Sequence, residues 1–195
     1  MAKLYFSYAA MNAGKSTILL QAAYNYRERG MDVLLLTSAL YKDDDAGHIS
    51  SRIGIGADAT LYTDKTDLLA LIRDRQSEHR IDAIFVDEAQ FLTKEQVWQL
   101  ARVADHLNVP VLAYGLRTDF RGELFEGSSA LLAIADSLRE VRTICECGRK
   151  ATMVIRLDAE GNAATEGDQV SIGKSTYVSL CRRHWEEKMG RFPPD

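Results

Sequence analysis

The sequence predicts an α/β fold in which helices cover both faces of a mostly parallel sheet, with a small separate lobe at the C-terminal end. Short apolar runs alternate with helical patterns over residues 1–143, as in parallel strands joined by crossover helices. A loop of small residues ending in Gly14-Lys15-Ser16-Thr17 follows the first strand. Over residues 144–195 the chain changes to short β-like pieces and contains all three cysteines. We therefore expect an α/β domain followed by a cysteine-bearing lobe.

Composition and charge restrict the class of protein. The chain has 195 residues, of which 46% are hydrophobic and 27% charged, as in an ordinary globular protein of one domain with a small appendage. Its net charge of -4 gives no basic surface for nucleic acid. No apolar run approaches the roughly 18 residues of a membrane span, and the N-terminus lacks the basic start and cleavage site of a signal peptide. We expect a cytoplasmic protein that binds neither nucleic acid nor membranes.

The first strand, loop and helix have the layout of a phosphate-binding P-loop. Backbone N–H groups of such a loop converge on an anion at the helix N-terminus, where the helix dipole also favours negative charge. Lys15 would contact the β- and γ-phosphates of ATP, and the hydroxyl of Ser16 would bind Mg²⁺. The residues that the motif predicts to bind ATP are Ala9, Ala10, Met11, Asn12, Ala13, Gly14, Lys15, Ser16 and Thr17.

One position departs from the usual P-loop pattern. Ala9 stands where the first glycine is usual, and a positive φ there would cost an alanine about 1 kcal/mol or more. We therefore expect Ala9 to have a negative φ or to be strained. The alternative is an ordinary helix start that contains Gly-Lys-Ser by chance. The flanking strand and helix favour the P-loop.

The other elements of the α/β part follow in order. The first helix ends at Gly30, a suitable C′ residue, and a buried strand over residues 33–37 comes next. Residues 39–57 are polar and contain glycines, His48 and Arg52. This segment is either a long mobile loop near the nucleotide or a solvated surface loop. Strands are then expected at residues 60–62, 81–86, 109–114 and 137–144, and helices from the cap Asp64 to about Glu78, from the cap Thr93 to about Leu107, and over residues 128–135.

A second cluster of chemistry-bearing residues follows the expected strand at residues 81–86. Asp87 and Glu88 come at its carboxyl end, the edge of a parallel sheet at which ligands bind. Together with the P-loop this is a Walker B arrangement, in which Asp87 would hold Mg²⁺ and Glu88 would be the base for the attacking oxygen. Asp87 and Gln90 complete the expected ATP-binding residues. The alternatives are an acid pair that caps a helix and the Asp-Glu-Ala-Gln box of RNA helicases, which one acidic domain does not fit.

Three cysteines and one histidine form the third cluster. Cys145 and Cys147 have C-x-C spacing before a glycine, and Cys181 and His184 have C-x₂-H spacing. Three thiolates and one imidazole complete a tetrahedral zinc site and leave no position for water, so the zinc is expected to be structural. An odd, clustered set of cysteines in a reducing compartment also favours metal over a disulfide. The alternative is three buried thiols and an unrelated histidine.

Short strands are expected to make up the C-terminal lobe. Their predicted ranges are 152–157, 169–172 and 177–180, with a turn-rich segment over residues 158–162 and a frayed end at residues 193–194. We expect no large apolar core between the two pairs of zinc ligands. Zinc would therefore hold this segment together.

With these clusters the chain resembles the thymidine kinases of the small, zinc-bearing cytosolic (type II) class. The resemblance spans nearly the whole length. Its most specific parts are residues 10–17 (AMNAGKST), 87–92 (DEAQFL) and 114–122 (YGLRTDFRG), and residues 147–151 (CGRKA) and 177–181 (YVSLC) extend it. Between Ile172-Gly173 and Tyr177 the chain is one residue shorter than in many members.

The resemblance implies transfer of the γ-phosphoryl group of ATP, with Mg²⁺, to the 5′-hydroxyl of thymidine or deoxyuridine. The product dTMP would serve nucleoside salvage and DNA synthesis. Glu88 falls at the position of the family's catalytic base, and the family is usually a homotetramer. The residues implied for the nucleoside pocket are Met11, Leu116, Phe120, Phe125 and Tyr177, the last on a zinc-pinned loop that closes over the nucleoside.

A nucleotide-switched binding module is a second possible function, of a different class. In a nucleotide-switched binding module, Glu88 would position a water molecule and the zinc lobe would bind a partner. The acidic balance argues against nucleic acid as that partner. Phe120 and Phe125, beside Arg117 and Arg121, offer the aromatic floor that a small planar substrate needs. The kinase is therefore the favoured function.

Overall fold

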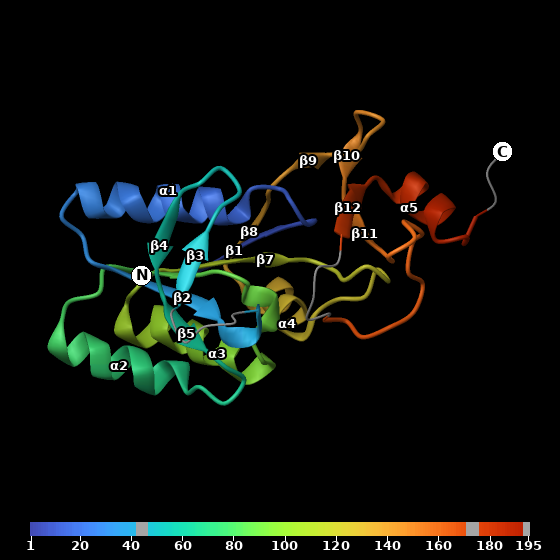
Figure 1. Cartoon of the computed structure of the whole chain (residues 1–195). Coiled ribbons are helices and arrows are strands. Elements are labelled where there is room, and N and C mark those ends of the chain that lie inside the picture. The colour runs from blue at the N-terminus through green and yellow to red at the C-terminus, as the bar shows by residue number, and fades with distance from the viewer. Residues whose placement is uncertain (42–46, 171–175, 193–195) are drawn as a thin grey trace.

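The computed structural model describes residues 1–41, 47–170 and 176–192 of the chain. At its centre is a six-stranded sheet with the strand order β5-β2-β6-β7-β1-β8 (Figure 1). Each neighbouring pair of strands in this sheet is parallel. The strands are β1 (Leu4–Ala9), β2 (Val33–Ser38), β5 (Thr60–Tyr62), β6 (Ala83–Val86), β7 (Val111–Leu116) and β8 (Ser137–Glu140). The predicted parallel α/β fold is confirmed.

Helices cover both faces of the sheet. Helix α1 (Lys15–Glu28) lies on one side, and α2 (Leu68–Glu78), α3 (Lys94–Arg102) and α4 (Glu126–Ile134) lie on the other (Figure 1). Successive residues of β6 pack on opposite faces of the sheet. Ile84 belongs to the apolar cluster with α2, α3 and α4, and Phe85 belongs to the apolar cluster with α1. Strand β6 is buried on both faces, as its continuous apolar run predicts.

Several helix ends lie where the local sequence predicts them. Helix α1 ends in a Schellman motif, since the N–H of Met31 donates to the carbonyl of Tyr26 and that of Gly30 to Arg27, with Gly30 at φ 71°. Helix α3 begins with the predicted capping box of Thr93 and Gln96. It continues beyond Arg102 as one π-helical stretch, η3 (Val103–Leu107).

Other element boundaries differ from the prediction. The cap of α2 is Asp67, which accepts a hydrogen bond from the N–H of Ala70 at 3.0 Å, and the predicted cap Asp64 lies in the preceding turn. That turn is held by Gln96 of α3, whose side-chain amide donates to the carbonyls of Thr63 and Thr66, so the helix starts one turn later. Helix α4 begins at residue 126 because Phe125 already forms its N-cap.

The strand predicted over residues 137–144 is two strands. Its first part, β8, pairs with β1 of the main sheet, and the second, β9 (Thr143–Ile144), pairs with β10 (Lys150–Ala151) in the C-terminal lobe. The chain leaves one sheet and enters another at this point. The division of the chain at residue 143 stays a prediction.

The polar segment at residues 39–57 contains regular structure. A 3₁₀ turn, η1 (Ala39–Tyr41), follows β2, and β3 (His48–Ser50) pairs with β4 (Gly56–Asp58) in an antiparallel hairpin. Ile49 of this hairpin is 1% exposed and belongs to the apolar cluster with α1. The hairpin is therefore packed onto the domain. Residues 42–46 of the expected mobile loop lie outside the described residues.

The C-terminal lobe has an apolar core of its own, contrary to the prediction. It consists of β9, β10, β11 (Met153–Leu157), β12 (Thr176–Leu180) and α5 (Arg182–Lys188). Ile155, Leu180 and Trp185 are among its buried residues. They lie too far apart in the sequence for a local pattern to reveal that they pack together. Residues 169–170 do not form the predicted strand, and residues 171–172 lie outside the described residues.

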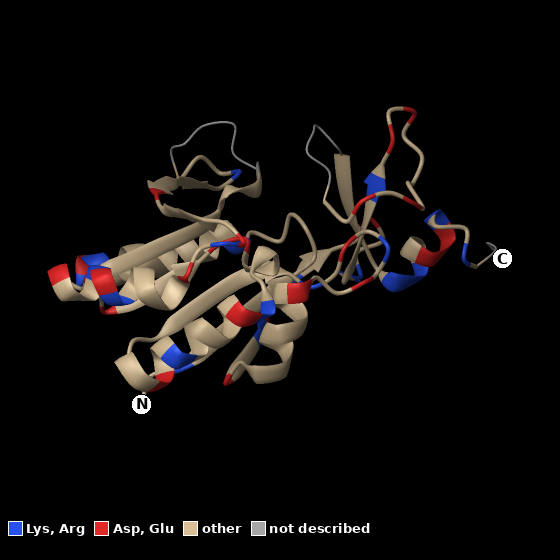
Figure 2. Ribbon diagram, turned by 90° about the horizontal axis from the view of Figure 1, so that it is seen from below, with Lys and Arg blue, Asp and Glu red and all other residues tan. Residues whose placement is uncertain are grey.

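Charged residues of both signs are interspersed along the described elements (Figure 2). None of the helices in the described part of the chain has the length and apolar character needed to span a bilayer.

Candidate active site

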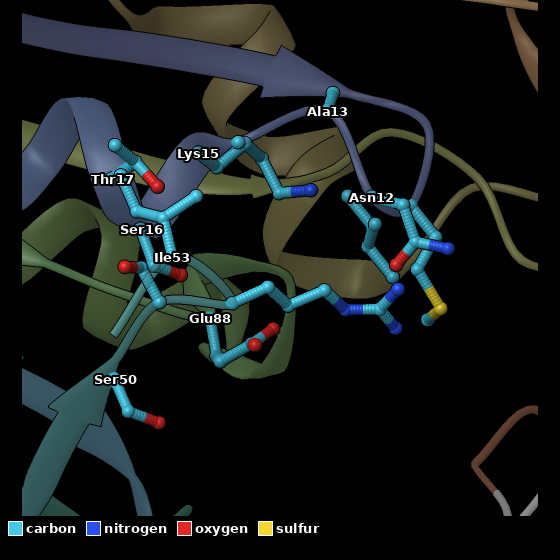
Figure 3. A pocket seen from close by; sticks show the side chains of 13 residues that line it. Asn12, Ala13, Lys15, Ser16, Thr17, Ser50, Ile53 and Glu88 are labelled. Carbon is cyan, nitrogen blue, oxygen red and sulfur yellow. The ribbon is translucent and has the colours of Figure 1, made fainter. Parts of the chain in front are cut away.

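A cavity of about 410 Å³ lies where the carboxyl ends of the central strands meet the N-terminus of α1. Figure 3 shows that Lys15, Ser16 and Glu88 lie around the same space, together with Ser50 and Ile53. In parallel sheets this edge is the usual place for a ligand. The residues that line the cavity are Met11, Asn12, Ala13, Gly14, Lys15, Ser16, Thr17, Ser50, Ser51, Arg52, Ile53, Glu88 and Leu116.

The loop between β1 and α1 has the backbone of a phosphate-binding loop. Gly14 has φ 81° and is the N-cap of α1, and Asn12 has φ 63°. These turns leave the N–H groups at the start of α1 available for an anion at the positive end of the helix. Ala9 is the last residue of β1 and is not among the described residues with positive φ, so it is unstrained.

Lys15 points into the cavity (Figure 3). Its ammonium group donates a hydrogen bond to the carbonyl of Ala10 at 3.2 Å. Burial lowers the pKa of Lys15, whereas the nearby carboxylates of Glu88 and Asp87 raise it. Lys15 is partly buried, and its ammonium group can exchange this carbonyl for a phosphate oxygen, with which it forms a charge-assisted hydrogen bond.

Asp87 and Ser16 lie together beside the phosphate loop. The hydroxyl of Ser16 donates to Oδ2 of Asp87 at 3.1 Å, and Asp87 is 5% exposed. Burial, followed by the charge of Glu88, raises the pKa of Asp87 to about 7, against the hydrogen bond from Ser16. A hydroxyl and a carboxylate are the hard oxygen donors that Mg²⁺ uses together with substrate phosphates. These two residues therefore fit the predicted magnesium site.

Glu88 is held by its neighbours in an unusual backbone conformation. Its φ and ψ are 53° and 38°, in the left-handed region that costs most residues about 1 kcal/mol or more. The side-chain amide of Gln90 donates to Oε2 of Glu88 at 2.5 Å, and Oε1 of Gln90 accepts from the N–H of Leu116 at 2.9 Å. Tyr62, which is buried, donates to the carbonyl of Glu88 at 2.9 Å. These bonds fix the direction of the carboxylate.

The sequence did not predict that Gln90 and Tyr62 hold Glu88 in position. In this structure both ends of the Gln90 amide group bind protein atoms, and its contact with ATP stays a prediction. No local pattern in the sequence marks Tyr62. It stands at the end of β5, and only its place at the carboxyl edge of the sheet could have drawn attention to it.

The residues expected to surround a nucleoside have different environments. Met11 and Leu116 line the cavity. Phe120 is 1% exposed and lies beneath the guanidinium of Arg156, at 4.1 Å from the ring centroid. Phe125 is also buried and contacts Phe91 edge-to-face, whereas Tyr177 on β12 is half-buried. Neither phenylalanine is among the residues that line the cavity described above.

Arg117 and Arg121, which lie beside Phe120 and Phe125 in the sequence, both form hydrogen bonds with protein atoms. Arg117 donates to the carbonyl of Thr152 at 2.9 Å, which joins the loop after β7 to the C-terminal lobe. Arg121 forms two hydrogen bonds with the carboxylate of buried Asp119, at 3.1 and 3.2 Å. Both side chains brace the segment at residues 117–125.

The zinc-binding residues predicted from the sequence lie together in the C-terminal lobe. The sulfur atoms of Cys145, Cys147 and Cys181 and one nitrogen of His184 all lie within 4.8 Å of one another. Sγ of Cys145 is 3.3 Å from Nδ1 of His184, and the Sγ atoms of Cys147 and Cys181 are 3.9 Å apart. The donor set and its size fit a closed, tetrahedral zinc ion. Four protein ligands would fill a tetrahedral site, and a structural role for the zinc stays a prediction.

The turn that carries the first two cysteines is made by backbone bonds. The N–H of Cys145 donates to the carbonyl of Arg149, and the N–H of Gly148 donates to the carbonyl of Cys145, both at 2.8 Å. Gly148 has φ 77°, which explains the glycine after the C-x-C pair. Burial would raise the pKa of Cys145, but backbone N–H groups of Cys147 and Cys181 and the side chain of His184 lower it to about 6.

Comparison with known proteins gives one consistent family. The family model described as "Thymidine kinase" matches residues 2–185. A thymidine kinase of Mesorhizobium japonicum is 64% identical over 195 residues, which is 100% of this chain and 96% of that protein. Thymidine kinases of Ruegeria pomeroyi and Vibrio cholerae are 65% and 57% identical, covering 97% and 98% of this chain and 96% and 100% of theirs.

Proposed function

Because the chain belongs to the thymidine kinase family, we propose that it phosphorylates the 5′-hydroxyl of thymidine with ATP in the cavity bounded by the phosphate loop and Glu88. The observation that carries this assignment of the site is the fixed carboxylate of Glu88 at the cavity lined by residues 11–17. In a kinase, a base beside the phosphoryl donor accepts the proton of the substrate hydroxyl. The hydroxyl thereby becomes a better nucleophile.

Each residue around the cavity has a separate task in this proposal. The N–H groups at the start of α1 and the ammonium of Lys15 bind the β- and γ-phosphates of ATP. Glu88 accepts the proton of the 5′-hydroxyl, and Gln90 and Tyr62 hold it in position. Ser16 and Asp87 hold Mg²⁺, which neutralises charge on the phosphates.

The nucleoside is proposed to bind beside the phosphate loop, toward the C-terminal lobe. Met11 and Leu116, at the cavity wall, support this position. Phe120, Phe125 and Tyr177 would complete the apolar surroundings of the base. The side-chain amide of Asn12 donates to the carbonyl of Tyr177 at 3.4 Å, which joins the phosphate loop to the strand proposed to cover the nucleoside. Deoxyuridine, which lacks only a methyl group, is the expected second substrate.

Structural zinc is proposed for the cysteine cluster, and a reducing cytoplasm suits it because the metal requires thiolates. A homotetramer is proposed from family membership alone. Sedimentation analysis of the purified protein tests it directly, because a monomer has only one quarter of the tetramer's mass.

The activity is tested by measuring ATP consumption with thymidine, without thymidine, and with 5′-deoxythymidine. The last compound keeps the base and sugar but has no 5′-hydroxyl to accept the phosphoryl group. We expect rapid turnover and thymidine 5′-monophosphate only with thymidine. Equal ATP hydrolysis in all three mixtures would indicate a nucleotide-switched module in place of a kinase.

A further inference from the structure

The hairpin β3–β4 presents a second cation to the proposed phosphate site. We propose that Arg52, in the turn of this hairpin, contacts the γ-phosphoryl group of ATP and stabilises it during transfer. This inference rests on the proposed function and extends it, because it adds a residue to the machinery of the same reaction.

The turn that carries Arg52 has a defined shape. The N–H of Ser51 donates to the carbonyl of Ile55 at 2.8 Å, and the N–H of Gly54 donates to that of Ser51 at 3.1 Å. Gly54 has φ 84°, which lets the chain reverse. Buried Ile49 anchors the hairpin in the core beneath α1. The turn is therefore attached to the same domain as the phosphate loop.

This turn forms one wall of the cavity. Figure 3 shows Ser50 and Ile53, on either side of Arg52 in the chain, at the cavity that Lys15, Ser16 and Glu88 surround. Arg52 itself is among the lining residues. The hairpin thus faces the phosphate loop across the space that the triphosphate of ATP would occupy.

Two polar side chains of the turn, those of Ser51 and Arg52, have no hydrogen-bond partner among the described residues. Arg52 has no hydrogen bond or ion pair to any described residue, in contrast to Arg117 and Arg121. Ser51 also lines the cavity. Its Oγ is the one buried side-chain polar atom among the described residues that has no hydrogen-bond partner. Buried polar groups normally have partners, so an orphaned hydroxyl at a cavity indicates a missing ligand.

The charge of the cavity favours a phosphate as that ligand. The described residues that line it include two cations, Lys15 and Arg52, and one carboxylate, Glu88, so the charge of the lining is positive on balance. Lys15 contributes a single point of charge, whereas a guanidinium presents a fork of N–H donors that matches two phosphate oxygens at once. During phosphoryl transfer, negative charge spreads over the equatorial oxygens of the transferred group. A guanidinium stabilises that charge through hydrogen bonds to these oxygens. Arg52 would thus act in the manner of an arginine finger supplied by the same chain.

The test compares wild type with Arg52→Ala, Arg52→Lys and the control Arg73→Ala, which removes an exposed arginine of α2. Arginines of this kind contribute about 10³–10⁵ to kcat, so Arg52→Ala should lower kcat by at least about 100-fold. The KM for thymidine should change by less than about threefold, because the substituted group contacts the phosphoryl donor. Arg52→Lys should recover only a small part of the rate, and the control should match wild type.

Chemical rescue separates a direct contact from a structural effect. Guanidinium ion added to Arg52→Ala should restore part of kcat and should not affect the control, because it can occupy the space that the side chain left. Thermal unfolding should be nearly the same for all four proteins, since Arg52 is exposed.

Three results would overturn the inference: Arg52→Ala within threefold of wild type, a loss confined to the KM for thymidine, or a loss of kcat that guanidinium leaves unchanged while the melting temperature falls. A wild-type protein that makes no thymidine 5′-monophosphate would instead refute the proposed function. The two failures are therefore distinguishable.

Discussion

At the scale of single residues, the site depends on how Glu88 is held. Its backbone is in the left-handed region, and its carboxylate receives a hydrogen bond from Gln90, which is itself fixed by the N–H of Leu116. A conformation of this cost persists only where the surroundings determine it, and such positions concentrate at functional sites. The backbone of Glu88 and the hydrogen bond from Gln90 therefore mark Glu88 as a functional residue of this site.

The first prediction concerns the charge of Glu88. Glu88→Gln keeps the shape of the side chain but cannot accept the proton of the 5′-hydroxyl. It should lower kcat by roughly 10²–10⁴, with the affinities for thymidine and ATP nearly unchanged. Steady-state kinetics and equilibrium binding measure the two effects. The exposed Glu95→Gln variant is the control, and a thymidine-independent ATPase that requires Glu88 would contradict the assignment.

The second prediction concerns the burial of Asp87. Burial and the charge of Glu88 raise its pKa from 3.8 to about 7 in the folded protein. Between these two values the folded chain binds more protons than the unfolded chain, so the stability contributed by this group is lost as the pH rises from about 4 to about 7. Asp87→Asn removes the titrating group. It should therefore weaken the fall in melting temperature between pH 5 and pH 8 for the protein without nucleotide and Mg²⁺.

The matched control for that prediction is Asp105→Asn, which changes an exposed aspartate on η3. This control should follow the wild-type curve of melting temperature against pH. Parallel curves for wild type and Asp87→Asn would show that Asp87 does not carry the expected pKa.

At the scale of elements, the segment at residues 117–125 is where the two parts of the chain are joined. The carbonyl of Phe120 accepts a hydrogen bond from Nε1 of Trp185 at 3.0 Å, and Arg117 binds the carbonyl of Thr152. The ring of Phe120 is fully buried beneath Arg156 of β11. This segment therefore links β7, at the cavity, to the C-terminal lobe.

The third prediction separates the two possible roles of Phe120. Phe120→Ala should lower the free energy of unfolding by about 3–5 kcal/mol, the usual cost of removing a buried phenylalanine. If Phe120 also forms the wall of the nucleoside pocket, as proposed, the KM for thymidine should rise about tenfold while that for ATP changes little. Chemical denaturation and steady-state kinetics measure these quantities.

Phe6→Ala provides the comparison, because Phe6 is a buried phenylalanine of the main sheet. It should cost similar stability without the selective effect on thymidine. Equal changes of both KM values in Phe120→Ala would limit Phe120 to a role in packing.

At the scale of the whole molecule, the zinc cluster and the phosphate loop are connected through β12. Strand β12 leads directly into Cys181, and its Ser179 donates a hydrogen bond to the carbonyl of Met11 in the phosphate loop. The amide group of Asn12 donates to the carbonyl of Tyr177 on the same strand. A metal that fixes one end of β12 therefore also supports the loop that is proposed to bind ATP.

The fourth prediction follows from this connection. The purified protein should contain about one zinc ion per chain, and Cys181→Ser should lose it. Without the metal, β12 loses its anchor, so the KM for thymidine should rise more than kcat falls. Elemental analysis and steady-state kinetics test both statements. Since the lobe also has an apolar core, we expect partial loss of order there, without unfolding of the main domain.

Arg182→Ala is the control for the metal experiment, because it changes the exposed neighbour of Cys181 and keeps all four ligands. It should retain zinc and wild-type kinetics. A fully demetallated protein with unchanged kinetics would refute a supporting role for the cluster.

Features that a few neighbouring residues encode could be predicted from the sequence. The phosphate loop, the Schellman end at Gly30, the capping box of Thr93 and the turn at Gly148 each depend on backbone bonds over a short stretch. The apolar periodicity of strands and helices likewise predicted the parallel sheet, since each element must bury one face. The residues of the zinc cluster could be predicted because three cysteines and one histidine in two closely spaced pairs match a tetrahedral zinc site.

Contacts between residues that are distant in the sequence could not be predicted in this way. Gln90 contacts both Glu88 and Leu116, and Tyr62 lies beneath Glu88, because separate strands end at the same edge of the sheet. The cap of α2 moved to Asp67 because a side chain of α3 holds the preceding turn. The apolar core of the C-terminal lobe combines residues from β10 to α5. Such contacts depend on the packing of whole elements, and a local pattern in the sequence carries no record of that packing.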